Sequence, residues 1–118
     1  MDDDACDLLC LDLPNAEAVR AGLPGSLQVE AWSRTAKALG DPTRLLIAIA
    51  LAASGSACGC DVAWIVGRDD KLVSHHLRAL KAAGAAVSRR DGKMVVYELT
   101  PAGRRLLSAL TSAPEVPA

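Results

Sequence analysis

The spacing of apolar positions predicts a mainly helical chain. Between Leu27 and Leu39, apolar residues recur at roughly every third or fourth position, as they do on one face of a helix. The stretch Leu45–Ala53 is apolar almost all round, which indicates a helix buried at the centre of the fold. Asp41 and Pro42 precede it and suit the N-cap and the first position of that helix.

Shorter helices are expected near both ends of the chain. Asn15–Ala21 predicts one short helix, which the Gly-Leu-Pro-Gly sequence at 22–25 ends. Ser26 is a suitable N-cap for the helix that follows. Thr100 and Pro101 indicate the start of a last helix that runs from about Ala102 to Thr111.

Two helices joined by a tight turn follow the central helix. The first is expected over about Asp61–Val66, and it stops at Gly67. The second is expected over Lys71–Ala83, has its apolar residues on one side, and stops at Gly84. This arrangement is typical of a helix-turn-helix, in which the second helix enters the major groove of DNA.

Two β-prone runs then flank an Asp-Gly pair at 91–92, which is a strong signal for a β-hairpin. The runs are Ala85–Arg90 and Lys93–Leu99. Basic residues near the hairpin tip suit a wing that lies along DNA phosphates, and they are Arg89, Arg90 and Lys93. The predicted fold is mainly α with a small β-hairpin, a winged helix-turn-helix.

Length and composition agree with a small helical protein. The chain has 118 residues, of which 51% are hydrophobic and only 3% aromatic, and this balance favours helices over a β-sandwich or barrel. The longest apolar run, Leu45–Ala53, is too short to span a bilayer. The start Met-Asp-Asp-Asp has the opposite charge to a secretory leader, so we expect a cytoplasmic protein with no membrane partner. The expected organisation is an arm at 1–25, a DNA-binding and dimerisation domain at 26–112, and a flexible tail at 113–118.

The net charge of −1 conceals a difference between the two halves of the chain. Residues 1–58 hold four Lys/Arg against eight Asp/Glu, whereas residues 59–118 hold nine against six. A locally basic surface on a nearly neutral chain supports nucleic-acid binding, because salt makes phosphate attraction a local effect. The alternative is a solvated basic face with no partner.

The four cysteines predict a binding site for a thiophilic metal ion. Cysteines in a cytoplasmic protein more often serve metal or redox chemistry than structural disulfides. Cys58 and Cys60 flank a glycine that lets both sulfurs aim at one ion, and Cys6 and Cys10 are spaced i, i+4 in the N-terminal arm. Thiolates select Cd²⁺, Pb²⁺, Hg²⁺, Cu⁺ or Zn²⁺ over Mg²⁺ and Ca²⁺, and four of them suit tetrahedral Cd²⁺ or Zn²⁺.

The cysteines also fit a packing role or a redox role. Free cysteines often pack as small hydrophobic residues, and a pair of thiols can form a redox switch. A small dithiol oxidoreductase is a poor match, because Cys-x-Cys differs from the Cys-x-x-Cys redox motif and the chain has no βαβ pattern. A metal buffer would not require the basic wing. We therefore expect neither an enzyme nor a small-molecule substrate.

Three stretches together resemble the ArsR/SmtB family of bacterial metal-sensing repressors. They are Ala38–Leu45 (ALGDPTRL), Val73–Leu80 (VSHHLRAL) and Gly92–Leu99 (GKMVVYEL), and the resemblance covers roughly residues 30–110. Within the family the chain is most similar to the cadmium- and lead-sensing branch, which joins a Cys-x-Cys at the helix-turn-helix to cysteines of an N-terminal arm. Cd²⁺ or Pb²⁺ is then the expected ion, with Zn²⁺, Hg²⁺ or arsenite as alternatives.

The resemblance implies a homodimer that binds operator DNA and is released by the metal. It implies that the arm of one protomer reaches Cys58 and Cys60 of the other, and it places DNA contacts on Lys71, Ser74, His75 and Arg78. His76 is expected to pack inward. A second metal site found in the family is not expected, because 101–107 has no His and no carboxylate. The acidic turn at 68–70 departs from the family pattern, so its carboxylates must point away from DNA or cap the second helix.

Overall fold

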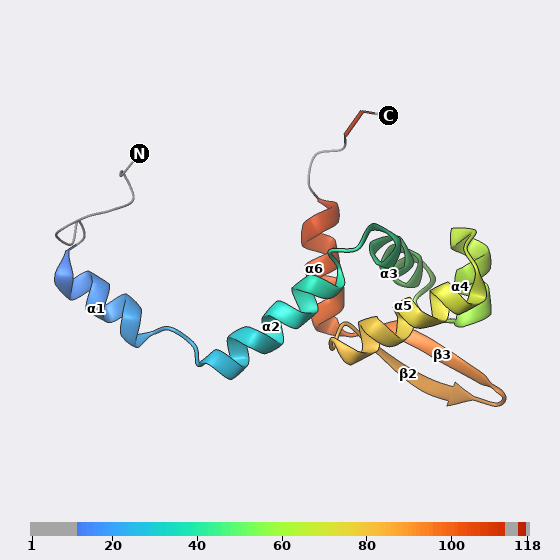
Figure 1. Cartoon of the computed structure of the whole chain (residues 1–118), viewed down its shortest axis with the longest axis horizontal. Coiled ribbons are helices and arrows are strands. Elements are labelled where there is room, and N and C mark those ends of the chain that lie inside the picture. Colours follow the sequence, from blue (N-terminus) through green and yellow to red (C-terminus); the bar gives the residue numbers. More distant parts are fainter. Residues whose placement is uncertain (1–11, 113–115, 118) are drawn as a thin grey trace.

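The computed structural model describes residues 12–112 and 116–117, and in this part of the chain it contains six helices and three strands (Figure 1). No helix in these ranges is both long enough and apolar enough to cross a membrane. The elements, in chain order, are α1 (Leu13–Ala21), α2 (Ser26–Ala38), α3 (Pro42–Ser54), β1 (Ala57–Cys58), α4 (Gly59–Val66), α5 (Asp70–Ala82), β2 (Ala86–Asp91), β3 (Met94–Leu99) and α6 (Pro101–Thr111).

The core lies where α3, α4 and α5 meet the sheet. Ile47 and Leu51 of α3 and Leu77 and Leu80 of α5 have no exposed surface. The apolar run in α3 is therefore a central helix, as its sequence predicted. One side of α3 is not covered by the rest of the protomer. Leu46 is 39% and Ile49 is 40% exposed on this side, and neither belongs to the core.

Polar caps define where several helices begin. Asp41 accepts a hydrogen bond from the backbone N–H of Arg44 at 2.9 Å, and α3 starts at the following proline, as predicted. Thr100 caps α6 by accepting from the backbone N–H of Gly103 at 3.0 Å. The prediction for α2 was wrong by one residue, because Gly25 occupies the N-cap and Ser26 is already helical.

The sheet is antiparallel with strand order β1-β3-β2. Asp91 pairs with Met94, so the hairpin turns on Gly92 and Lys93, one residue later than the Asp-Gly signal indicated. Gly92 has a φ of +64°, and no residue other than glycine has a positive φ in the described chain, so Lys93 does not. Positive φ at the first turn residue alone is the pattern of a type II′ turn, which glycine favours at that position.

The two N-terminal helices contribute little to this core. No residue of α1 is buried, and Ala38 is the only buried residue of α2. The Thr35 hydroxyl of α2 donates to the carbonyl of Ala83 at 2.7 Å, which ties the end of α2 to the end of α5. The long axis of the molecule measures 62 Å, and Figure 1 shows α1 at one end of it and α4 at the other.

Candidate DNA-binding surface and thiol pocket

The helix α5 is the candidate recognition helix, and an acidic residue caps it. The carboxylate of Asp69 accepts hydrogen bonds from the backbone N–H groups of Lys71, at 3.0 Å, and Leu72, at 3.3 Å. This satisfies two donors that the first turn of a helix leaves unpaired. Of the two alternatives for the acidic turn, capping holds for Asp69. Asp70 is the first residue of the helix and lies in its first turn.

The residues expected to contact DNA lie on the outward side of α5. Lys71, His75 and Arg78 are exposed, and Ser74 is half-buried. The inward side of the helix packs on the core and consists of Val73, His76, Leu77 and Leu80. The structure thus brings the four candidate DNA contacts together on one face, and the contacts themselves stay a prediction.

His76 lies inward, as expected, and is held by two residues of the α3 N-terminus. Its Nδ1 accepts a hydrogen bond from Nε of Arg44 at 3.2 Å, and its Nε2 lies 4.0 Å from the Asp41 carboxylate. Burial, and then the positive charge of Arg44, lower the pKa of His76, although Asp41 acts in the opposite direction. A neutral imidazole with its proton on Nε2 suits this arrangement.

The hairpin of β2 and β3 carries the basic residues of the candidate wing. Arg89 and Arg90 lie on β2, Lys93 lies in the turn, and all three are exposed. Glu98 of β3 pairs with two arginines: its carboxylate accepts a hydrogen bond from Nη2 of Arg104 at 2.9 Å and lies 3.6 Å from Nη1 of Arg89. Arg90 and Lys93 form no ion pair within the described residues, so their charges are the less compensated ones of the wing.

A side-chain hydrogen bond joins the candidate recognition helix to the wing. Nζ of Lys81, in the last turn of α5, donates to Oγ of Ser88 on β2 at 2.8 Å. The sequence did not predict this bond, because no local pattern indicates that positions seven residues apart meet across a helix and a strand. The bond restrains the angle between the two elements expected to contact DNA.

Two free thiols lie where the sheet meets the first helix of the helix-turn-helix. Cys58 ends β1 and is half-buried, whereas Cys60 is in the first turn of α4 and is exposed. Strand β1, which the sequence did not predict, pairs Ala57 with Tyr97 and Cys58 with Val96 of β3. The backbone of Cys58 is therefore part of the same sheet as the wing.

Both thiols line one open pocket of about 590 Å³, which we call the thiol pocket. Ser74 and Arg78 of α5 and Lys93 of the wing line the same pocket. Its other lining residues are Gly59, Asp61, Asp70, Met94, Val95 and Tyr97. Two of the four candidate metal ligands and three candidate DNA contacts thus share a single cavity.

The donor atoms at this pocket suit a thiophilic ion. The sulfurs of Cys58 and Cys60 favour soft metals when they bind as thiolates, and the carboxylates of Asp61 and Asp70 line the same pocket. Within residues 12–112 and 116–117, no group of three or more such residues is close enough to hold an ion alone. The other two candidate ligands, Cys6 and Cys10, lie outside the described residues.

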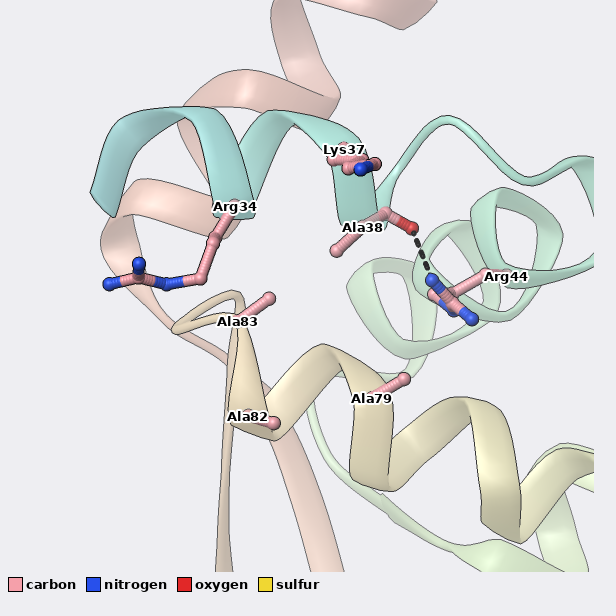
Figure 2. A pocket seen from close by; sticks show the side chains of 7 residues that line it. All are labelled: Arg34, Lys37, Ala38, Arg44, Ala79, Ala82 and Ala83. Atoms are coloured by element: carbon pink, nitrogen blue, oxygen red, sulfur yellow. Dashed lines mark hydrogen bonds between the residues drawn. The ribbon is translucent and has the colours of Figure 1, made fainter. Parts of the chain in front are cut away.

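A second cavity, of about 370 Å³, lies between α2, α3 and α5 (Figure 2). Three basic residues line it, with Arg34 and Arg44 at opposite ends and four alanines between the helices: Ala38, Ala79, Ala82 and Ala83. Arg44 also donates to the carbonyl of Ala38 at 3.4 Å, so this side chain joins two helices as well as holding His76. The cavity shares no lining residue with the thiol pocket.

Sequence comparisons connect this fold to bacterial regulators. Residues 41–86 match the profile of the bacterial regulatory protein, arsR family. The chain is 32% identical over 97 residues to the cadmium resistance transcriptional regulatory protein CadC of Listeria innocua, a match that covers 82% of the chain and 81% of that protein. It is 49% identical over 63 residues to a CadC homolog of Staphylococcus aureus, which covers 53% of the chain and 52% of that relative.

Comparisons with solved structures agree with the sequence matches. The chain is similar to a homodimeric winged helix-turn-helix DNA-binding domain from Mycobacterium bovis, with a TM-score of 0.68 and 26% identity over 77% of the chain and 86% of that domain. It is also similar to the AntR antimony-specific transcriptional repressor, with a TM-score of 0.61 and 25% identity over 93% of the chain and 88% of that protein. These likenesses confirm the winged helix-turn-helix predicted from the sequence.

Proposed function

Because the chain belongs to the ArsR family of bacterial regulatory proteins, we propose that it is a cytoplasmic transcriptional repressor released from operator DNA by a thiophilic metal ion. Cd²⁺ is the first candidate ion, since the relatives that match most of the chain are cadmium resistance regulators. Pb²⁺ is the second, followed by Zn²⁺ and Hg²⁺. The named relatives are regulators rather than enzymes, in agreement with the expectation from the sequence.

The observation that carries this proposal is the sharing of the thiol pocket. Cys58 and Cys60 line the same cavity as Ser74, Arg78 and Lys93. An ion held by the thiols lies beside residues that we expect to contact DNA, so binding of one ligand changes the surroundings of the other. The effect on DNA then comes from movement of the elements that carry the ligands.

The positions of the two thiols suit such movement. Cys58 is paired to the wing strand β3 through Val96, and Cys60 belongs to α4, the helix that packs directly on α5. Drawing the two sulfurs toward ligands of the arm changes the position of the wing and of the helix-turn-helix together. The coupling between metal and DNA is reciprocal and typically about 1–3 kcal/mol, or roughly 5–150-fold in affinity.

We propose that operator DNA is contacted by α5 and by the wing. Lys71, Ser74, His75 and Arg78 reach bases or phosphates of the major groove, and Arg89, Arg90 and Lys93 reach phosphates beside it. The exposure of six of these side chains supports this assignment, and the ion pair of Arg89 with Glu98 makes Arg89 the weakest contact of the wing. A palindromic operator would match the symmetry of a dimer.

The homodimer is supported by the apolar surface of α2. This helix of 13 residues buries only Ala38, while Leu27 is 81% and Trp32 58% exposed. Leu110 of α6 is also 46% exposed. Apolar area of this extent is typical of a subunit interface, and the similar domain from Mycobacterium bovis is described as homodimeric. We therefore propose that α2 and α6 form the dimer interface.

The complete metal site is proposed to contain Cys6, Cys10, Cys58 and Cys60, with the first pair from the partner subunit. Cys10 precedes α1 by only three residues, a reach of roughly 10 Å. Within one protomer, α1 and α4 lie at opposite ends of the long axis (Figure 1). In a dimer that pairs through α2 and α6, the partner subunit supplies the arm, so the arm does not have to span the length of one protomer to reach Cys58 and Cys60.

Operator binding with and without metal tests the proposal. Fluorescence anisotropy of labelled operator DNA should show tight binding by the reduced metal-free protein and weaker binding after Cd²⁺ or Pb²⁺ is added. Absorption of the thiolate-to-metal bond reports the number of ligating sulfurs. Cys58→Ser and Cys60→Ser should retain DNA binding and lose the metal response. Unchanged DNA affinity with every thiophilic ion, despite metal uptake, would refute the proposal.

Arsenite or an oxidant are alternative signals for the same thiols. The chain is 37% identical over 65 residues to the arsenical resistance operon repressor of Escherichia coli, which covers 55% of the chain and 56% of that relative. Arsenite and hydrogen peroxide therefore belong in the same anisotropy experiment. Release by peroxide with disulfide formation, and not by metal, would replace metal sensing by redox sensing.

A further inference from the structure

A large aromatic side chain stands uncovered on the first helix of the helix-turn-helix. Trp64 of α4 is 85% exposed, and its neighbour Ile65 is 50% exposed. A tryptophan side chain offers roughly 150–250 Å² of mainly apolar surface, and it is enriched where proteins bind one another. The inward side of α4 is packed, since Val62 and Ala63 are buried in the core. This surface therefore suits a partner that covers it.

We propose that α1 of the partner subunit docks on Trp64 when the thiol site binds metal. The inference rests on the proposed function, because the metal is what would bring the two helices together. Helix α1 is itself unpartnered: none of its residues is buried, and Leu13 and Val19 are 51% and 58% exposed. Two uncovered apolar surfaces of one chain thus become complementary in a dimer.

The spacing of ligands and apolar residues carries the argument. Trp64 follows Cys60 by four residues on α4, so their side chains lie on the same face about 6 Å apart. Leu13 follows Cys10 by three residues and begins α1. A metal ion shared by Cys10 and Cys60 therefore brings the first turn of α1 close to Trp64.

The protomer cannot cover Trp64 with its own α1 in the arrangement observed. The two helices lie at opposite ends of the molecule (Figure 1), and Gly22–Gly25, which precedes α2, spans at most about 14 Å. A second copy of the chain is therefore the occupant to which the geometry points.

Charge favours one direction for the partner helix. Glu17 lies one turn after Leu13 on α1, and Arg68 follows Gly67, the left-handed C-cap that ends α4. Arg68 is exposed, and its guanidinium contacts only the carbonyls of Val66 and Gly67 among the described residues. If the two helices run parallel from a shared metal, Glu17 lies toward the C-terminal end of α4, where Arg68 follows the helix. An exposed ion pair of this kind sets orientation more than affinity.

Tryptophan fluorescence tests the docking directly. The chain has two tryptophans, so the Trp32→Phe variant leaves Trp64 as the single reporter. Phenylalanine keeps an aromatic side chain at the proposed dimer interface, and sedimentation analysis checks that this variant has the same oligomeric state as the wild type. Cd²⁺ titration of this full-length dimer should shift the Trp64 emission to shorter wavelength and reduce its quenching by acrylamide. Thiolate-to-Cd²⁺ absorption, recorded on the same sample, shows whether the metal has bound. In a second variant, Trp64→Ala, the affinity for Cd²⁺ should fall by about tenfold or less.

Two matched substitutions on α1 provide the control. Leu13→Ala, in the Trp32→Phe background, should abolish most of the emission shift while the absorption titration still reaches the same stoichiometry. Val19→Ala removes a similarly exposed apolar group six residues further along, on a different face of the helix, and should preserve the shift. Because both residues are exposed, neither change removes a core contact.

The outcomes separate this inference from the proposed function. Full metal absorption and metal-induced DNA release with no change at Trp64 would overturn the docking and leave the function intact. An emission shift that appears on adding operator DNA to the metal-free protein, and not on adding Cd²⁺, would assign Trp64 to DNA and also overturn it. Absence of metal absorption would contradict the proposed function itself, and the docking with it.

Discussion

The side chain of Arg44 donates a hydrogen bond from Nε to Nδ1 of His76 at 3.2 Å, which links the first turn of α3 to the middle of the candidate recognition helix α5. The same guanidinium reaches the carbonyl of Ala38 at 3.4 Å. His76 is only 8% exposed, and its inward position fixes which side of α5 faces outward. The orientation of the candidate DNA contacts thus depends on a neutral imidazole in the core.

Acid should therefore destabilise the protein through His76. Its folded-state pKa is lowered by burial and by Arg44, so the unfolded chain takes up the proton at higher pH than the folded one. The stability that the neutral imidazole contributes is fully present above its ordinary pKa of 6.5 and is lost as the pH falls below it. Urea denaturation between pH 7.5 and pH 5 measures this slope, with those limits chosen about one to two units either side of 6.5.

The neighbouring histidine is the matched control for this prediction. His76→Asn should flatten the pH dependence, at some cost in stability at neutral pH. His75→Asn changes an exposed side chain of the same type and should leave most of the acid sensitivity in place. Equal slopes for the wild type and His76→Asn would contradict the assignment.

Gly103→Ala should destabilise the fold by about 1–3 kcal/mol or more. A Cβ at this position would clash with the carbonyl oxygen of Ala85, whose backbone cannot move without disturbing the hydrogen bond that it accepts from the Thr100 N–H at 2.9 Å. Thermal unfolding compares this variant with Gly25→Ala, where a Cβ meets nothing within 4 Å. A loss at Gly103 no larger than that at Gly25 would show that α6 shifts freely.

Asp69→Ala should reduce stability by about 1 kcal/mol, because it leaves the N–H groups of Lys71 and Leu72 without their cap. Asp70→Ala removes a carboxylate that makes no cap hydrogen bond, so only its favourable interaction with the helix dipole is lost, about 0.3–1 kcal/mol. Urea midpoints measure both. A larger loss at Asp70 than at Asp69 would be inconsistent with the cap.

Arg78→Ala should weaken operator binding by the metal-free protein and lower the slope of log affinity against log salt by about one, if the guanidinium contacts a phosphate. Arg78 is exposed and lines the thiol pocket. The control is Arg20→Ala, on α1, which is exposed and lies away from the proposed DNA surface. Anisotropy titrations at several salt concentrations provide the comparison, and equal slopes for both variants would remove Arg78 from the interface.

Much of the fold was predictable because local signals were strong. Asp41 and Pro42 mark the start of α3 by chemistry that acts within one turn, and the two β-prone runs around Gly92 specify a hairpin. The boundaries shifted by one residue where two neighbours were both suitable, as with Gly25 and Ser26. Such shifts occur because a helix that begins at either of two neighbouring residues has nearly the same local free energy.

The arrangement of the site was less accessible from the sequence. Strand β1 has two residues, which is too short for an alternation pattern, and only pairing with Tyr97 and Val96 defines it. Pairings across long sequence separations, such as Arg44 with His76, depend on tertiary packing and leave no local signal. The cysteines were found because thiols are rare and reactive, yet their proximity to Arg78 and Lys93 emerges only in three dimensions.

At the short strand β1, the conformation of the main chain does not depend on which side chains occupy positions 58 and 60. Hydrogen bonds of the main chain define the strand that ends at Cys58, and the next turn of helix begins at Gly59, whichever atoms the side chains at 58 and 60 carry. Ligand chemistry can therefore be exchanged at these two positions while the scaffold is conserved. This makes the chain a suitable starting point for engineered biosensors, in which imidazole or carboxylate groups replace sulfur to retune the ion that is detected.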